Sequence, residues 1–139
     1  MTEGGGYFSL DQGLEPTGTG RFVEREDIDP VQFVPGLSFM PILGDRAMVN
    51  WVHFDPNTEA PLHAHEEEQF TIVIEGELEF EIDGDVRVMR PGTVAAIPPG
   101  VPHGARTGET SCLEIDVFVP PRKALLGLMK GAAEKPAND

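Results

Sequence analysis

The sequence predicts an all-β protein whose short strands form a sandwich or a barrel. Three observations lead to this fold class. Segments rich in β-forming residues are short and recur at regular spacing over much of the chain. In one of them, Leu78, Phe80 and Ile82 alternate with glutamates, which places the three apolar side chains on one face of a strand. The 16 glycines and 13 prolines are scattered between these segments as turn residues.

The expected strands follow from local composition and from the turns that separate them. The turn Asp55-Pro56-Asn57 ends the first predicted strand, and Asp83-Gly84 predicts a tight hairpin. The run 70–74 is almost continuously apolar, so we expect that strand to be covered on both faces. The predicted strands are, in chain order, 46–54, 70–74, 77–82, 86–88, 94–97, 103–106 and 112–119.

The two ends of the chain are expected to lie outside the barrel. Residues 1–20 are predicted to be flexible or to exchange as a strand between two chains. Residues 21–121 are assigned to a single β-barrel domain. In 122–139, apolar residues such as Leu125 and Met129 fall at helical spacing, which predicts a short helix followed by a frayed tail.

Length, charge and cysteine content narrow the class of protein. The 139 residues suffice for one domain with a hydrophobic core. Ten basic against 24 acidic residues give a net charge of -14, which disfavours nucleic acid and membrane surfaces as partners. Cys112 is the single cysteine, so no internal disulfide can form. With no signal peptide or spanning segment recognised, we expect a cytoplasmic protein.

Three imidazoles and one amide form the strongest candidate site. Residues two apart on a strand share a face, so His63, His65 and Gln69 are expected to point the same way from one strand. The proline-rich turn at 98–102 would bring His103 to them from a neighbouring strand. Imidazole is a preferred ligand of many transition metals. The four residues therefore predict one divalent metal ion, with Zn, Ni, Fe, Mn and Co all acceptable.

The spacing of these residues resembles the two signature motifs of the cupin family. The first motif reads His63-x-His65-x3-Gln69-x6-Gly76, and the second reads Gly92-x5-Pro98-x-Gly100-x2-His103. The resemblance covers about residues 47–118. It implies a double-stranded β-helix, which is a jelly-roll barrel, with a metal ion inside it and a homodimer as the assembly.

Two positions depart from the usual cupin motifs. Most cupins have a glutamate where this chain has Gln69, and Thr107 replaces an asparagine that often closes the second motif. A neutral amide leaves the ion more strongly Lewis acidic. It also departs from the two-histidine, one-carboxylate set of oxygen-activating iron sites, so the ligands favour non-redox chemistry. An alternative is that Gln69 turns away and water takes its place.

A downstream strand carries further candidate residues. The pattern Asp116-x-Phe118-x3-Arg122, together with the three-histidine, one-glutamine set, is similar to the KdgF-type cupins of pectin and alginate degradation. That resemblance implies an isomerase or lyase that converts 4,5-unsaturated uronates, which are small anionic sugar acids, to their linear ketone form. The implied catalytic residues are Asp116 for proton transfer, Arg122 for carboxylate binding and Phe118 as the pocket wall. Without the resemblance, all three are ordinary strand and strand-end residues.

Two other functions stay open on the sequence. One is a cupin dioxygenase of the quercetinase type, which would consume oxygen. The other is a non-catalytic cupin that binds a small ligand or a metal ion as a sensor or store. His53 lies outside both motifs and is expected to be structural, and Cys112 is expected to be a small buried apolar residue.

Overall fold

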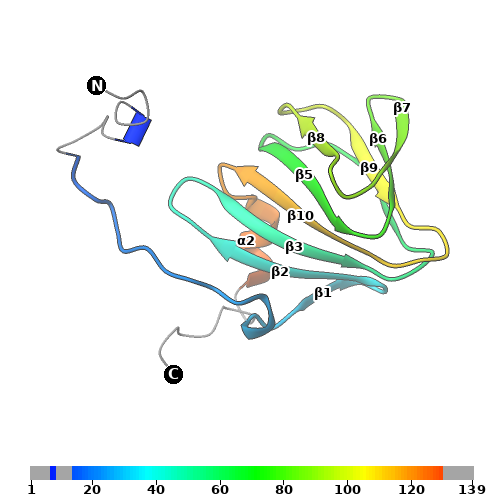
Figure 1. Ribbon diagram of the computed structural model, residues 1–139. Helices are drawn as coiled ribbons and strands as arrows, with labels where there is room; N and C mark the ends of the chain where they lie inside the picture. The colour runs from blue at the N-terminus through cyan, green and yellow to red at the C-terminus, as the bar shows by residue number, and fades with distance from the viewer. Residues whose placement is uncertain (1–6, 9–13, 130–139) are drawn as a thin grey trace.

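The computed structural model describes residues 7–8 and 14–129, and its regular structure is almost entirely β-sheet. The described strands form two antiparallel sheets, one of six strands and one of four, which confirms the all-β prediction (Figure 1). Residues 1–6, 9–13 and 130–139 lie outside the described part, so a flexible or exchanged segment over 1–20 and a frayed tail at the other end stay predictions. No described helix is long and apolar enough to span a membrane.

The six-stranded sheet has the order β1-β2-β3-β10-β5-β8. Its strand β10 lies between β3 and β5, so that Asp116 is opposite Asn50 on one side and Thr71 on the other. This register brings polar side chains from three strands to the same level of the sheet. The bounds are β1 (Val31–Val34), β2 (Leu37–Leu43), β3 (Met48–Phe54), β5 (Glu68–Glu75), β8 (Val94–Ile97) and β10 (Cys112–Val119).

The four-stranded sheet has the order β4-β9-β6-β7. Its strands are β4 (Glu59–His63), β6 (Leu78–Ile82), β7 (Asp85–Met89) and β9 (His103–Arg106). The predicted hairpin between β6 and β7 is confirmed, because Asp83 and Gly84 have φ angles of 49° and 88°, as a tight turn of this kind requires. Gly76, which follows β5, has a φ of 85°, and a Cβ there would collide with the carbonyl oxygen of Ser111.

The strand predictions agree with the structure for β3 and from β5 onward, and they miss β4 and the hairpin formed by β1 and β2. β1 and β2 were not predicted, and Pro41 lies inside the apolar run of β2, where a proline is unusual for a strand. Pro41 is tolerated because β1 pairs only with the first part of β2. The expectation that 70–74 is covered on both faces is wrong for the single chain, since Ile74 is 37% exposed.

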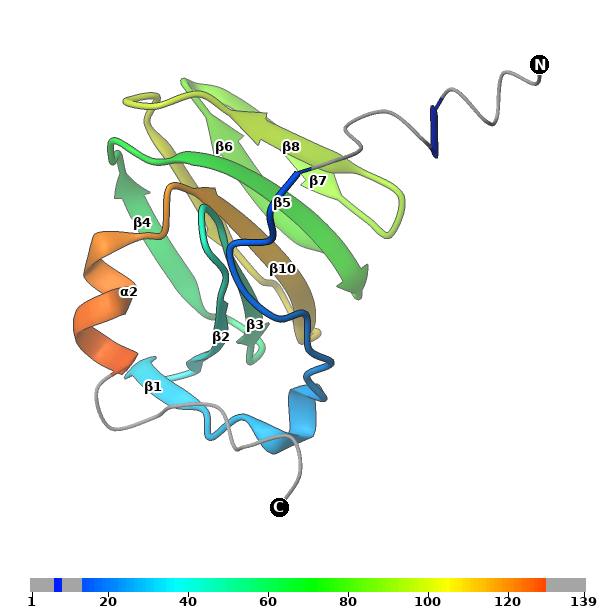
Figure 2. The same ribbon diagram turned by 90° about the vertical axis from the view of Figure 1, so that its left-hand side faces the viewer.

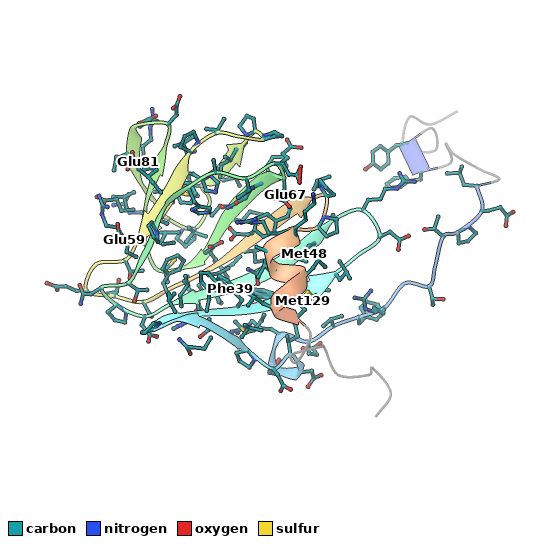
Figure 3. The ribbon with its side chains drawn as sticks, turned by 180° about the vertical axis from the view of Figure 1, so that it is seen from behind. Phe39, Met48, Glu59, Glu67, Glu81 and Met129 are labelled. Atoms are coloured by element: carbon teal, nitrogen blue, oxygen red, sulfur yellow. The ribbon has the colours of Figure 1, made fainter. Side chains whose placement is uncertain are left out.

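The main core fills the space between the two sheets, and a helix closes one end of it. Figure 2 shows the short helix α2 (Lys123–Leu128) at the edge of the barrel, near β1 and β4. Leu125 of α2 packs against Met48 and Phe118, and Phe39 and Met129 flank this second apolar cluster (Figure 3). An apolar helix face in contact with the sheet explains why so short a helix forms at the predicted place.

Candidate metal centre

The candidate ligands converge from both sheets and from the link between them. His63 ends β4 and His103 begins β9, and the two are register partners. Gln69 belongs to β5 in the other sheet, and His65 lies in the link between β4 and β5. The prediction that His63, His65 and Gln69 share one strand is therefore wrong. The chain leaves one sheet after His63 and bends at residues 66 and 67 before it enters the other, so strand parity does not carry through.

Backbone carbonyls orient all three imidazole rings. Each ring places Nδ1 within hydrogen-bond distance of a carbonyl oxygen two residues away in the chain. Only a protonated Nδ1 can donate to a carbonyl, so the neutral ring keeps its lone pair on Nε2. The distances from Nδ1 to the carbonyl oxygen are 2.8 Å for His63 to Pro61, 3.0 Å for His65 to Glu67 and 2.9 Å for His103 to Val101.

Burial keeps two of these rings neutral. Burial and the positive charge of Arg122 lower the pKa of His65. Burial lowers the pKa of His103 to about 4. At neutral pH both rings are therefore unprotonated at Nε2, which is the form that binds a metal ion.

The amide of Gln69 has a fixed orientation with its oxygen toward the histidines. Its nitrogen donates to Thr71 Oγ1 at 2.9 Å and to Asp116 Oδ1 at 3.2 Å. Its Oε1 then lies 3.0 Å from Nε2 of His65 and 3.1 Å from Nε2 of His103. The alternative in which Gln69 turns away from the histidines is not the arrangement in this structure.

These atoms fit a divalent cation. The ligand nitrogens of His63, His65 and His103 lie within 4.8 Å of one another. The Gln69 oxygen faces two nitrogen lone pairs with no proton available between them, and a cation among them would remove that repulsion. Ligands at right angles around an ion, each about 2.1 Å from it, would be about 3 Å apart, which matches the contacts of Gln69.

Asp116 lies one amide group away from the histidines. Its Oδ1 accepts hydrogen bonds from Gln69 and, at 2.8 Å, from Thr71 Oγ1. Burial raises the pKa of Asp116, although hydrogen bonds with Glu114 and Thr71 oppose the shift. A carboxyl group with a raised pKa beside a metal site can hold and release a proton.

Phe118 and Arg122 lie on the same side of the site as α2. The ring of Phe118 is buried and meets the ring of His65 edge-on, with 5.7 Å between centroids. Arg122 immediately precedes α2, and its NH1 is 3.7 Å from Oε1 of Glu67. The structure thus brings Asp116, Phe118 and Arg122 to one cavity together with His63, Gln69 and His103, while His65 lies outside the lining.

Sequence reasoning missed two buried glutamates near the site. Glu67 accepts the backbone N–H of Lys123 at 2.9 Å, and its other oxygen lies 3.4 Å from Nδ1 of His65. Burial alone would raise the pKa of Glu67, but the Lys123 N–H and the charge of Arg122 lower it overall. Nothing in the run of three glutamates singled it out. Glu114 has the same strand parity as Asp116, which was the only available signal.

The shared cavity has a volume of about 550 Å³ and two groups of polar residues, which meet at the hydrogen bond from Gln69 to Asp116. We call the group formed by His63, Gln69 and His103, together with His65 just outside the lining, the metal-ligand end. Asn50, Glu114 and Asp116 on β3 and β10 are the carboxyl end. The rest of the wall is mainly apolar, with five phenylalanines among the lining residues, namely Phe33, Phe39, Phe54, Phe80 and Phe118.

Two other candidates lie away from this site, as expected. The side chain of His53 is exposed and lies 3.5 Å from Asp55. Cys112 is buried in the core, and burial raises the pKa of its thiol to about 11. Its reactive thiolate is therefore scarce at neutral pH.

Comparison with known proteins places the chain in one family. The family described as "Cupin domain" matches residues 50–118. An RmlC-like cupin from Shewanella frigidimarina is 30% identical with a TM-score of 0.72, over 77% of this chain and 96% of the other. KdgF from a Halomonas species is 30% identical with a TM-score of 0.73, over 77% and 99% of the two chains.

A third similar structure has a different chemistry in its name. The polyketide cyclase RemF from Streptomyces resistomycificus is 26% identical with a TM-score of 0.65, over 73% of this chain and 80% of the other. No curated protein sequence matches the chain. The two facing sheets, the histidines at their junction and the match across β3 to β10 agree with one another. The chain belongs to the cupin family.

Proposed function

We propose that this cupin is a metal-dependent, non-redox enzyme that moves protons on a small sugar acid, with conversion of 4,5-unsaturated uronates to their linear ketone form as its reaction. The observation that carries the proposal is the hydrogen bond from Gln69 to Asp116, because Gln69 also faces two of the histidines. A proton-handling carboxyl group is thereby held directly beside a metal-type site.

In this proposal His63, His65, Gln69 and His103 hold one divalent ion. When bound, the ion supplies Lewis acidity toward substrate oxygens, which the neutral amide ligand leaves largely undiminished. The identity of the metal among Zn, Ni, Fe, Mn and Co is a matter for measurement, because imidazole and amide ligands accept each of them. The residues around the ligands then decide the reaction.

Asp116 carries the proton in the proposed ring opening. The reaction is an isomerisation, in which the hydroxyl at the anomeric carbon loses a proton, the ring C–O bond breaks, and a ring carbon of the former alkene gains a proton. One carboxyl group can accept the first proton and supply the second. The raised pKa of Asp116 and its hydrogen bond from Thr71 suit both roles.

Arg122 and Phe118 position the substrate. Arg122 borders the cavity while it pairs with Glu67, which leaves several of its five N–H donors for a carboxylate of the substrate. Phe118 packs against the His65 ring and excludes water on that side. The similarity to KdgF over most of both chains supports this assignment.

The test is turnover of unsaturated galacturonate and mannuronate by the metal-loaded protein, followed as loss of the alkene absorbance. We expect Asp116→Asn to reduce the rate by roughly 100-fold to 10,000-fold, the range for general acid–base groups. Asp85→Asn is the matched control, because Asp85 is exposed on β7. Metal content should not change in either variant. Absence of turnover with every metal, in protein that binds the metal, would refute the uronate assignment.

A second substrate class is favoured by the cavity wall. Five phenylalanines line the cavity, whose wall is mainly apolar, and such a wall suits a largely apolar ring. RemF, which is a polyketide cyclase, gives this substrate class a precedent among similar structures. Binding of aromatic carboxylates without uronate turnover would favour it. Oxygen consumption would instead favour a dioxygenase, and ligand binding without turnover a non-catalytic cupin.

We further propose that the protein forms a homodimer and works in the cytoplasm. Apolar side chains remain exposed on β7 and β8, where Val86, Val88 and Val94 are each more than 40% exposed. Sedimentation analysis of the parent and of Val88→Lys tests the dimer on this surface. A parent that sediments as a monomer would contradict it.

A further inference from the structure

The carboxyl end of the cavity contains two buried acceptors that the proposed reaction does not use. Asn50 on β3 and Glu114 on β10 are 1% and 3% exposed, respectively. Both line the cavity. Asn50 is the register partner of Asp116, and Glu114 is two residues from Asp116 on the same strand. The side chains therefore lie on one inward face of two adjacent strands.

One oxygen of each side chain has no hydrogen-bond donor among the residues that the structure describes. These oxygens are Oδ1 of Asn50 and Oε1 of Glu114. By contrast, Gln69 and Thr71 both donate to Asp116 in the same cluster. An unpaired acceptor in an apolar interior is destabilising, so two that border one cavity point to a ligand that brings donors.

The charge state of Glu114 decides what kind of donor fits. Burial and the neighbouring Asp116 raise the pKa of Glu114 well above its usual range. The protonated carboxyl donates to Asp116, and Oε1 remains as a neutral carbonyl-type acceptor. Asn50 Oδ1 is also neutral. Such a pair accepts from a hydroxyl group and offers nothing to the oxygens of an ionised carboxylate or a phosphate, which can only accept.

We propose that Asn50 and Glu114 form a hydroxyl-binding subsite that accepts a hydrogen bond from a hydroxyl on the ring of the substrate. This inference deepens the proposed function and rests on it for the identity of the cavity as a substrate site. Because the carboxyl groups of Glu114 and Asp116 are hydrogen-bonded to each other, a bound hydroxyl would lie close to the reacting part of the ring. The ligand class is a hydroxylated ring with an acidic group, from either a sugar acid or a phenolic acid.

The subsite would make Asn50 and Glu114 specificity-determining residues. A ring that lacks the hydroxyl would leave both acceptors unpaired in the bound state. Sites built around buried polar groups discriminate strongly against such analogues. Asp116 would act on the reacting atoms, whereas Asn50 and Glu114, which lie beside Asp116, would hold a hydroxyl group on the adjacent part of the ring.

The experiment measures binding by calorimetry on the metal-loaded parent protein. Benzoate and 3-hydroxybenzoate differ by one hydroxyl group and share the carboxylate, and galacturonate represents the sugar acids. For a phenolic ligand we expect 3-hydroxybenzoate to bind about tenfold more tightly than benzoate, the size of one well-placed hydrogen bond. For a sugar ligand we expect galacturonate to bind and both benzoates to bind weakly and equally.

Two variants of Glu114 separate the subsite from a structural role. Glu114→Leu removes the acceptor and should weaken the hydroxylated probe about tenfold while benzoate binding stays the same or improves. Glu114→Gln keeps a neutral carbonyl oxygen and a donor toward Asp116, so it should retain parent-like binding. Asn50→Leu should act in the same direction as Glu114→Leu. Metal content and thermal unfolding establish that each variant is folded.

The outcomes decide the inference independently of the reaction. Equal binding of the benzoates by the parent, combined with galacturonate binding that the leucine variants leave unchanged, would overturn it. If the leucine variants do not fold, Asn50→Ser serves instead, and a parent without hydroxyl-dependent binding for either ligand class still overturns it. Hydroxyl-dependent binding without uronate turnover would refute the proposed reaction and leave the subsite standing.

Discussion

At the metal-ligand end of the cavity, backbone carbonyls accept hydrogen bonds from Nδ1 of three imidazoles, and Gln69 donates to Thr71 and Asp116. At the carboxyl end, Glu114 retains its own proton, and two acceptor oxygens have no donor among the described residues. The first end presents fixed lone pairs that suit a cation. The second presents neutral acceptors that suit a hydroxyl group. Burial of His103 and of Glu114 therefore produces opposite ligand preferences, because histidines lose protons on burial and carboxyl groups gain them.

The contrast between the two ends requires that the histidines form one metal site, so the largest expected effect of a substitution is on metal binding. His103→Ala removes a buried ligand and should weaken Zn²⁺ binding by roughly a thousandfold, beyond the 10- to 100-fold effect of losing an outer partner. Metal titration by calorimetry measures it. His53→Ala is the control, because His53 is exposed and lies away from the site. Equal affinity in His103→Ala and the parent would contradict the assignment.

The pH dependence of unfolding should differ in sign between the two ends. In metal-free protein the pKa of His103 is lowered from 6.5 to about 4, so the unfolded state binds more protons in that interval and stability falls as pH falls through it. The effect reaches up to about 3 kcal/mol. The raised pKa of Glu114 acts oppositely, since stability is lost as pH rises above about 4.5.

Urea unfolding of metal-free protein between pH 4 and pH 8 separates these contributions. His103→Gln should lose the dependence between pH 4 and 6.5, so its stability relative to the parent is highest at low pH. Glu114→Gln should gain stability relative to the parent as pH rises. Parallel pH curves for the parent and both variants would show that neither group is shifted as described.

The smallest expected effect concerns Glu67, which connects the metal-ligand end to the start of α2. Glu67→Gln removes the charge that faces Arg122 and His65, and we expect a loss of about 1–2 kcal/mol in the free energy of unfolding. Glu66→Gln is the matched control, because its pair with Lys123 is largely exposed and should contribute little to stability. Equal effects of the two substitutions would mean that burial of Glu67 adds nothing.

Most of the fold and the ligand set could be predicted because the signals are local. Alternation in 77–82 predicts one strand, and Asp83-Gly84 predicts the turn that follows it. The spacing of histidines, glycines and prolines predicted which residues gather, although not that they come from both sheets. β1 and β2 were not predicted, and Pro41 interrupts the strand pattern of β2. Pro41 is tolerated since β1 pairs only with the part of β2 before it, and this pairing cannot be read from the sequence.

The sequence by itself determined the all-β class, the hairpin and the short terminal helix, because periodicity and turn chemistry act within a few residues. The grouping of His63, Gln69 and His103 followed from the spacing of two family motifs. Tertiary structure decided that the oxygen of the Gln69 amide, and not its nitrogen, faces the histidines. It also decided that Glu67 is buried and that Asn50 lies beside Asp116. Those contacts join residues that are tens of positions apart. Their register depends on how whole strands pair and on how the two sheets pack, which no local pattern specifies.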